Sequence, residues 1–301
     1  MAMTQTLGFI GLGNMGGPMA QRLSAAGYSV VAFDKNPQAL DACSGPEHSN
    51  SALECAQAAD ILFTSLPRPD HVSGLMLGEG LANVLHSEQI WVDLTTNRKA
   101  FLQDMDRNFP FRVVDAPVTG AVDGARTGRL TLFAGGETDA LDTVEPLLSQ
   151  LGRVIRCGPL GTGTVTKLVT NQLWFVHAAA LGEAFAFGMA NDVELATLWD
   201  AIKDSVADSF VARHDAPSIF AGHYDPSFTL DLCLKDLGLL AEMEDRVGTD
   251  LPMTDAAHQV FQQAGERYGR QAGEMHVARR LEEDAGLSFR MDGDWVPHWE
   301  A

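Results

Sequence analysis

Residues 6–16 read Thr-Leu-Gly-Phe-Ile-Gly-Leu-Gly-Asn-Met-Gly, an apolar run followed by the spacing Gly-x-Gly-x-x-Gly. The apolar run predicts a buried β-strand over Thr6–Ile10, and the glycines stand where this strand turns into a helix. In such a unit Gly11 permits the tight turn, Gly13 lets a pyrophosphate approach the backbone, and Gly16 lets the helix pack closely on the strand. The stretch therefore predicts a dinucleotide-binding β–α unit near the start of the chain.

Two neighbouring features favour a bound dinucleotide. The helix start at Asn14 and Met15 offers free backbone N–H groups and the positive end of the helix dipole to phosphates. A second predicted strand leads into Asp34, at the distance along the chain where an acid binds the adenosine ribose hydroxyls. A carboxylate there accepts hydrogen bonds from a ribose diol and repels a 2′-phosphate, so we expect NAD rather than NADP. The adjacent Lys35 offsets part of this repulsion.

Apolar β-prone runs alternate with amphipathic stretches through the first half of the chain. We predict strands at Thr6–Ile10, Ser29–Phe33, Asp60–Leu66, Ile90–Leu94, Arg112–Ala116 and Leu130–Ala134. Helices are predicted between them, for example over Gly17–Ala26 and Asn97–Arg107. Strands that are apolar on both faces are typical of a mostly parallel sheet covered by helices. We therefore expect an α/β Rossmann-type domain with a doubly wound sheet over residues 1–161.

The pattern changes after the turn-rich segment 158–163. Helices are predicted beyond it at Val165–Ala190, Leu195–Ser205, Asp231–Arg246 and Thr254–Tyr268, which implies an all-helical domain over residues 162–301. The first of these helices is apolar on nearly every side, so we expect it to be buried between domains or between subunits. The irregular tail after Gly286 carries Trp295 and Trp299, which we expect to dock on a partner subunit.

The chain of 301 residues is strongly acidic, with 21 Lys and Arg against 40 Asp and Glu and a formal net charge of −19. That charge disfavours binding to nucleic acids and to anionic membrane surfaces. No apolar run is long enough to span a membrane and the N-terminus lacks the basic flank of an export signal, so we expect a soluble, cytoplasmic protein. The four cysteines form no Cys-x-x-Cys pair and the nine histidines show no metal-binding spacing, so the sequence predicts no metal site.

Four stretches, in the same order, resemble the β-hydroxyacid dehydrogenase family, the group typified by 3-hydroxyisobutyrate dehydrogenase. They are GFIGLGNMGGPMAQRL (8–23), DAPVTG (115–120), GTGTVTKLVTN (161–171) and KDLGL (235–239). The resemblance implies a Rossmann-type domain, a helical C-terminal domain, catalysis in the cleft between them, and a homodimer or homotetramer. It also implies hydride transfer between a nicotinamide cofactor and a short 3-hydroxyacid or the matching semialdehyde or ketone.

The resemblance implies catalytic roles for Lys167 and Asn171. The two residues stand one turn apart in a predicted helix, so their side chains lie on one helix face. Removal of a hydride from an alcohol requires a base at the hydroxyl, and the reverse reaction requires an acid there; a desolvated lysine performs both tasks. The amide of Asn171 would orient the substrate or the lysine. Spacing alone equally allows a lysine whose stem packs on the helix while its ammonium reaches solvent.

Four further residues are expected at the cofactor. Leu66 and Pro67 follow one predicted central strand and Thr96 follows the next. Ligands of open α/β sheets bind beyond the carboxyl ends of the strands, so these residues are expected at the nicotinamide ribose. The resemblance implies that Lys235 reaches the nicotinamide end and closes the site.

The resemblance also places Thr119, Gly120 and Ala121 at the substrate carboxylate. Many relatives have Ser-Gly-Gly there, whose hydroxyl and backbone N–H groups hold the anion. Thr119 keeps the hydroxyl and adds a methyl group, and Ala121 adds a Cβ. Carboxylate binding is therefore expected in a pocket of altered shape.

Three alternatives remain open. Imine reductases and other semialdehyde-reducing relatives share this architecture, but imine reductases usually carry Asp or Tyr where Lys167 stands. Decarboxylating 6-phosphogluconate dehydrogenase shares the opening motif, but it is longer and its catalytic segment does not match residues 170–173. A non-catalytic dinucleotide-binding module would not need Lys167, Asn171 and Lys235 together.

Overall fold

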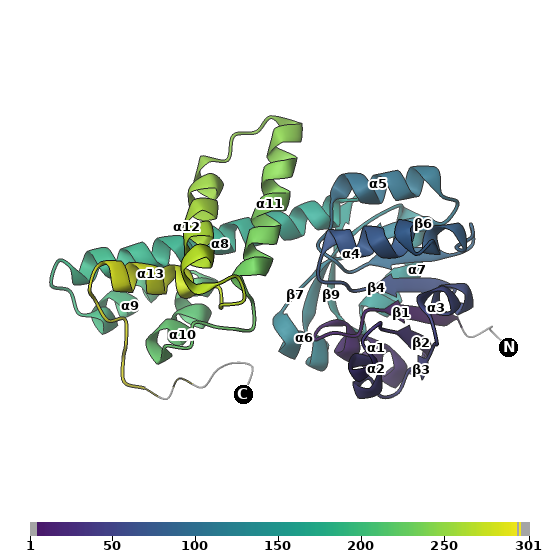
Figure 1. Ribbon diagram of the computed structural model, residues 1–301, viewed down its shortest axis with the longest axis horizontal. Coiled ribbons are helices and arrows are strands. Elements are labelled where there is room, and N and C mark those ends of the chain that lie inside the picture. The colour runs from purple at the N-terminus through teal and green to yellow at the C-terminus, as the bar shows by residue number, and fades with distance from the viewer. Residues whose placement is uncertain (1–4, 294, 296–301) are drawn as a thin grey trace. The chain divides into compact units, whose positions relative to one another are not determined.

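The computed structural model of the chain describes residues 5–293 and 295. The chain divides into two compact units, of which the first ends at Lys167 and the second begins at Leu168. The division falls inside one long helix, α8 (Thr162–Met189), which contributes to both units. Figure 1 shows the first unit, in purple to teal, around a sheet, and the second, in green to yellow, built of helices.

A nine-stranded sheet forms the first unit, in the order β3-β2-β1-β4-β5-β6-β8-β7, with β9 paired to β8. The strands are β1 (Thr6–Ile10), β2 (Ser29–Phe33), β3 (Glu47–His48), β4 (Ile61–Thr64), β5 (Ile90–Asp93), β6 (Arg112–Asp115), β7 (Val118–Thr119), β8 (Leu130–Gly135) and β9 (Gly152–Gly158). The neighbouring strands in the run β3-β2-β1-β4-β5-β6 all pair in parallel. Strand β8 is antiparallel to β6 and β7 and parallel to β9. The order 3-2-1-4-5-6 is that of Rossmann folds, so the predicted fold class is confirmed.

Successive residues of the central strands enter two separate cores, because side chains alternate between the faces of a sheet. Phe9 of β1 and Phe63 of β4 stack in one core, and Trp91 of β5 lies in the other. The first core is completed by α1 (Gly16–Ala25), α6 (Ala121–Thr127) and α7 (Thr138–Leu148). The second is completed by α3 (Ala52–Ala58), the π-helical turn η1 (Gly74–Gly78) and α5 (Lys99–Asn108). Helices on both faces explain why the strands are apolar throughout (Figure 1).

The second unit is helical, as predicted. It contains most of α8 together with α9 (Leu195–Lys203), the π-helical turn η3 (Val211–Asp215), α10 (Ala216–Ala221), α11 (Leu230–Val247), α12 (Pro252–Tyr268) and α13 (His276–Asp284). Buried phenylalanines fill its core, namely Phe175, Phe185, Phe220, Phe261 and Phe289. Among the helices of the described residues, none combines the length and the apolarity needed to cross a membrane.

In the single chain, α8 is not buried all round. Val169 is 45% exposed, Leu173 is 55% exposed and Phe187 is 75% exposed. Burial of these side chains between subunits stays a prediction.

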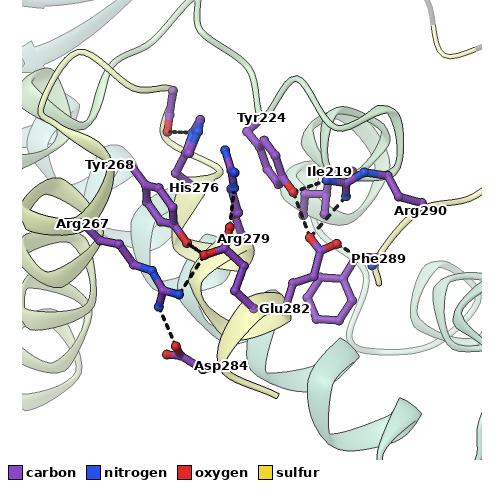
Figure 2. Close-up of polar contacts among 12 residues, drawn as sticks. Ile219, Tyr224, Arg267, Tyr268, His276, Arg279, Glu282, Asp284, Phe289 and Arg290 are labelled. Carbon is purple, nitrogen blue, oxygen red and sulfur yellow. Dashed lines mark hydrogen bonds and ion pairs between the residues drawn. The ribbon is translucent and has the colours of Figure 1, made fainter. Parts of the chain in front are cut away.

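The segment after α13 is held to the body of the second unit by a buried carboxylate. Glu282 accepts hydrogen bonds from the Tyr224 hydroxyl (2.8 Å) and the Phe289 backbone N–H (3.0 Å), and it pairs with Arg290 (3.2 Å) (Figure 2). Trp295 then packs edge-on against Trp199, with ring centroids 5.7 Å apart. The ring of Trp295 is thus partly covered within its own chain. Docking of the tail on a partner subunit stays a prediction, and Trp299 lies outside the described residues.

Candidate active site

The loop between β1 and α1 has the geometry that its three glycines predict. Gly11 has a positive φ of +96°, and a Cβ there would lie 2.3 Å from the Ser65 carbonyl oxygen. A Cβ on Gly16 would lie 1.9 Å from the Gly11 carbonyl oxygen, so any side chain there would open the turn. Gly13, by contrast, is exposed and faces open space. The loop thus leaves room for a ligand at its middle glycine.

Asp34 is fixed beside this loop by two backbone N–H groups. Its Oδ2 accepts a hydrogen bond from Leu12 (2.6 Å), and its Oδ1 accepts one from Asn36 (2.7 Å). No side chain caps the start of α1, and its first turn contains no acidic residue. The uncapped helix start and the open Gly13 fit the pyrophosphate of a dinucleotide. The fixed carboxylate of Asp34 fits its ribose.

The ends of β4 and β5 are joined through a buried carboxylate that the sequence did not single out. Asp93 Oδ1 accepts hydrogen bonds from the Thr64 hydroxyl (2.9 Å) and the Thr95 backbone N–H (3.1 Å), and its Oδ2 accepts one from the Asn97 amide (2.6 Å). Burial raises the pKa of the Asp93 carboxyl above its usual value, and these hydrogen bonds oppose that rise. Asp93 therefore holds in place the loop that carries Thr96.

The predicted cofactor residues of these two loops remain accessible. Thr96 and Leu66 are half-buried, and Pro67 is exposed. Thr95, which precedes Thr96, is buried, and its hydroxyl accepts a hydrogen bond from the Leu66 backbone N–H (3.1 Å). Both loops follow parallel neighbouring strands, so they lie at the same edge of the sheet as the glycine loop.

The segment predicted to bind the substrate carboxylate has an unusual backbone. Gly120 has φ +123° and Ala121, the first residue of α6, has φ +52°. A left-handed alanine is uncommon and costs roughly 1–2 kcal/mol, a cost that glycine would not have at this position. The half-buried Thr119 pairs with Thr131 of β8 in an antiparallel register.

Asp115, at the end of β6, anchors the start of α8. Its Oδ1 accepts a hydrogen bond from the Gly161 backbone N–H (2.7 Å), and its Oδ2 accepts one from Thr164 (2.6 Å). A Cβ at Gly163 would lie 2.0 Å from the Phe133 carbonyl oxygen, so only glycine allows the helix start to approach β8 this closely. Burial raises the pKa of the Asp115 carboxyl to about 6, against the lowering effect of these N–H donors. The sequence motif contains Asp115, but its anchoring role needed the fold.

The predicted pair Lys167 and Asn171 stands one turn apart on α8, and both side chains are buried, at 7% and 3% exposure. Asn171 donates a hydrogen bond from Nδ2 to Oδ2 of Asp236 in α11 (2.7 Å). Lys235 pairs with the other oxygen of the same carboxylate (2.9 Å). Within the second unit, Asp236 thus joins two predicted site residues.

Asp236, which joins these two candidate residues, was not predicted from the sequence. It is the second residue of the KDLGL segment, in which only Lys235 was assigned a role. An available signal was its position between Leu234 and Leu237 in an apolar stretch, since a buried acid requires partners.

Comparisons with known proteins agree with these features. Residues 6–161 match the family described as the NAD binding domain of 6-phosphogluconate dehydrogenase. Residues 161–281 match the family described as the NAD-binding of NADP-dependent 3-hydroxyisobutyrate dehydrogenase.

Individual relatives agree with these family matches. The chain is 33% identical over 273 residues to an NAD-dependent L-serine dehydrogenase of Pseudomonas aeruginosa, covering 85% of this chain and 90% of the relative. It is 31% identical over 269 residues to a 3-hydroxyisobutyrate dehydrogenase of the same organism, with 85% and 90% covered. A 3-hydroxyisobutyrate dehydrogenase of Mycobacterium tuberculosis, solved with L-serine, has a TM-score of 0.85 at 26% identity, with 93% of this chain and 99% of that chain covered. The chain therefore belongs to the β-hydroxyacid dehydrogenase family.

Proposed function

We propose that the chain is a dehydrogenase that interconverts a short 3-hydroxyacid and the corresponding semialdehyde or ketone, with NAD as its preferred cofactor and Lys167 as its general acid–base. The observation that carries the proposal is the buried pair Lys167 and Asn171 on one face of α8, with Asn171 held by Asp236. Burying a lysine and an amide together on an apolar helix costs free energy, so such pairs are rare and commonly have a functional role.

The chemistry required of Lys167 is proton transfer at the substrate hydroxyl. A neutral amine takes the hydroxyl proton during oxidation, and the ammonium returns it during reduction. Burial favours the neutral form of an amine, which is the form that acts as base. The bound nicotinamide would supply the hydride acceptor. Asn171, whose amide is oriented by Asp236, would hold the reacting oxygen or the lysine in line.

Substrate recognition is proposed to rest on Thr119 and Gly120. The Thr119 hydroxyl and the backbone N–H of Gly120 are donors suited to a carboxylate; Thr119 ends β7, and Gly120 follows it directly before α6. The Ala121 methyl group would leave less room for the substrate carboxylate than a glycine at this position.

For the cofactor, we propose that Asp34 selects NAD. Each of its oxygens already accepts one backbone N–H, and each keeps a second lone pair for a ribose hydroxyl. A 2′-phosphate, as in NADP, would lie close to this carboxylate and be repelled by its negative charge. The relatives include a protein named as NAD-dependent, whereas one matched family is described as NADP-dependent.

The test is a turnover assay on L-serine, 3-hydroxyisobutyrate, 3-hydroxypropionate, glycerate and 4-hydroxybutyrate, each with NAD and with NADP. We expect reduced cofactor to form with at least one acid, and kcat/KM to be at least about tenfold higher with NAD, the equivalent of roughly 1.4 kcal/mol. Tight NADH binding without turnover on any of these acids would instead favour the non-catalytic module. Turnover of cyclic imines in place of the acids would favour the imine reductase alternative.

Asp236 gives a second, sharper test as a positioning residue. Asp236→Asn is expected to lower kcat by about tenfold, since the Asn171 amide loses a charged acceptor. If Asp236 acts through Asn171, Asn171→Ala combined with Asp236→Asn will be no slower than Asn171→Ala alone. Asp245→Asn, near the exposed end of the same helix, is the matched control and should keep the parental kcat. Additive losses in the double variant would contradict this role.

A further inference from the structure

Three carboxylates from distant parts of the second unit converge in its interior. Asp215, Asp225 and Glu274 are 2%, 3% and 1% exposed, and one oxygen of each lies within 4.8 Å of those of the other two. None of them belongs to the site described above. Three like charges removed from water at this separation repel one another strongly, so the group requires compensation.

The local backbone accounts for this convergence. Asp215 ends the π-helical turn η3, and Asp225 lies in the loop before α11 with φ +43°. Glu274 is placed beside that loop because its backbone N–H donates to the Phe228 carbonyl (3.0 Å). A Cβ at Gly273 would lie 2.2 Å from the Asp225 carbonyl oxygen, so glycine is required for the two segments to meet.

Neighbouring donors orient two of the three carboxylates. The Trp174 indole donates to Asp215 Oδ2 (2.7 Å), and His214 Nδ1 lies 2.9 Å from Asp215 Oδ1. Asp225 Oδ1 accepts a hydrogen bond from the Ser227 backbone N–H (2.9 Å). Such outer hydrogen bonds typically orient carboxylates that bind metals.

Glu274 differs from the other two. Its Oε2 is buried and has no hydrogen-bond partner among the residues that the structure describes. A fully buried carboxylate oxygen without a donor is rare and needs a ligand or a proton.

We propose that Asp215, Asp225 and Glu274 bind a hard divalent cation, with calcium as the best-fitting ion. The donor set consists of oxygen atoms, which suits Ca²⁺, Mg²⁺ or Mn²⁺ rather than Zn²⁺. Two oxygens bound to one Ca²⁺ at roughly 2.4 Å lie at most about 4.8 Å apart, and the oxygens of the three carboxylates meet this condition, since they lie within 4.8 Å of one another.

Terbium luminescence is the direct test, because Tb³⁺ replaces Ca²⁺ and Trp174 lies against a proposed ligand. The whole protein is freed of metals with a chelator and titrated with Tb³⁺ while tryptophan is excited. We expect one saturable, calcium-displaceable site. Glu274→Gln and Asp225→Asn should each weaken binding by at least about tenfold, the loss typical of removing a charged ligand. Glu282→Gln is the matched control, since Glu282 is a buried carboxylate bonded to Tyr224 and Arg290, and it should keep the affinity.

A second measurement covers variants that lose stability. Calcium at one hundred times its Kd should raise the melting temperature of the wild type by on the order of 5 °C and leave that of Glu274→Gln unchanged. Glu274→Gln should melt higher than the wild type in chelator, which shows that it folds. No saturable binding by the wild type at millimolar calcium, or binding that Glu274→Gln retains in full, would overturn the proposal.

Discussion

Replacement of Lys167 by alanine is expected to lower kcat for hydroxyacid oxidation by about three orders of magnitude, the range typical of a lost general acid–base. The side chain is buried on α8 one turn before Asn171, so neither solvent nor a neighbouring residue on that helix face replaces its amine. Binding of NADH, followed by its fluorescence, should change little, because the proposed contacts to the dinucleotide are made by the glycine loop and Asp34 and not by Lys167. The measurement is a set of steady-state rates over the range pH 6 to 10.

Lys167→Arg separates proton transfer from mere positive charge. Arginine keeps the charge but is not deprotonated in proteins, so it cannot act as a base. We therefore expect it to be about as slow as the alanine variant. The control is Lys203→Ala, since Lys203 lies over the Trp199 ring and pairs with Asp200, away from the proposed machinery. An arginine variant close to wild-type activity would contradict general acid–base catalysis and leave an electrostatic role.

The fold was largely predictable where strands are buried on both faces. The strands at Thr6–Ile10 and Ser29–Phe33 were predicted with their observed bounds, because a continuous apolar run has no other stable place in a soluble domain. Strand β9 (Gly152–Gly158) was missed: Arg153 and Arg156 interrupt its apolar pattern, and it pairs only with β8 among the described strands. The two-residue strands β3 and β7 are too short to leave a periodic signal.

Residues of the candidate site could be named from the sequence only where they form a local motif. The glycine loop, Asp34 and the Lys167–Asn171 pair can be identified from spacing alone or from the family resemblance. Asp93, Asp236 and the cluster of Asp215, Asp225 and Glu274 could not, because their partners come from distant segments. In a chain with 40 acidic residues, buried carboxylates look the same as those on the surface until the fold separates them.

The second large effect is expected at Asp115, through the pH dependence of stability. Its carboxyl has a folded-state pKa of about 6, against an unfolded value near 3.8. The folded protein thus binds this proton more tightly than the unfolded chain does, and between the two values the folded state binds more protons. Its free energy of unfolding therefore falls as the pH rises, by roughly 3 kcal/mol in total, since each pKa unit corresponds to about 1.4 kcal/mol.

Asp115→Asn isolates this effect, because all other titrating groups are common to both proteins. Asparagine keeps one acceptor oxygen but turns an NH₂ group toward the backbone N–H of Gly161 or Thr164, so we expect a loss of about 1–3 kcal/mol near pH 4. The variant cannot ionise at this position, so the difference in unfolding free energy between wild type and variant should shrink as the pH rises from 4 to 7. Urea unfolding at four pH values measures it. A constant difference would mean that the Asp115 pKa is unshifted. A difference that widens with pH would mean that the Gly161 and Thr164 donors outweigh burial, and that a charged Asp115 anchors the helix carrying Lys167.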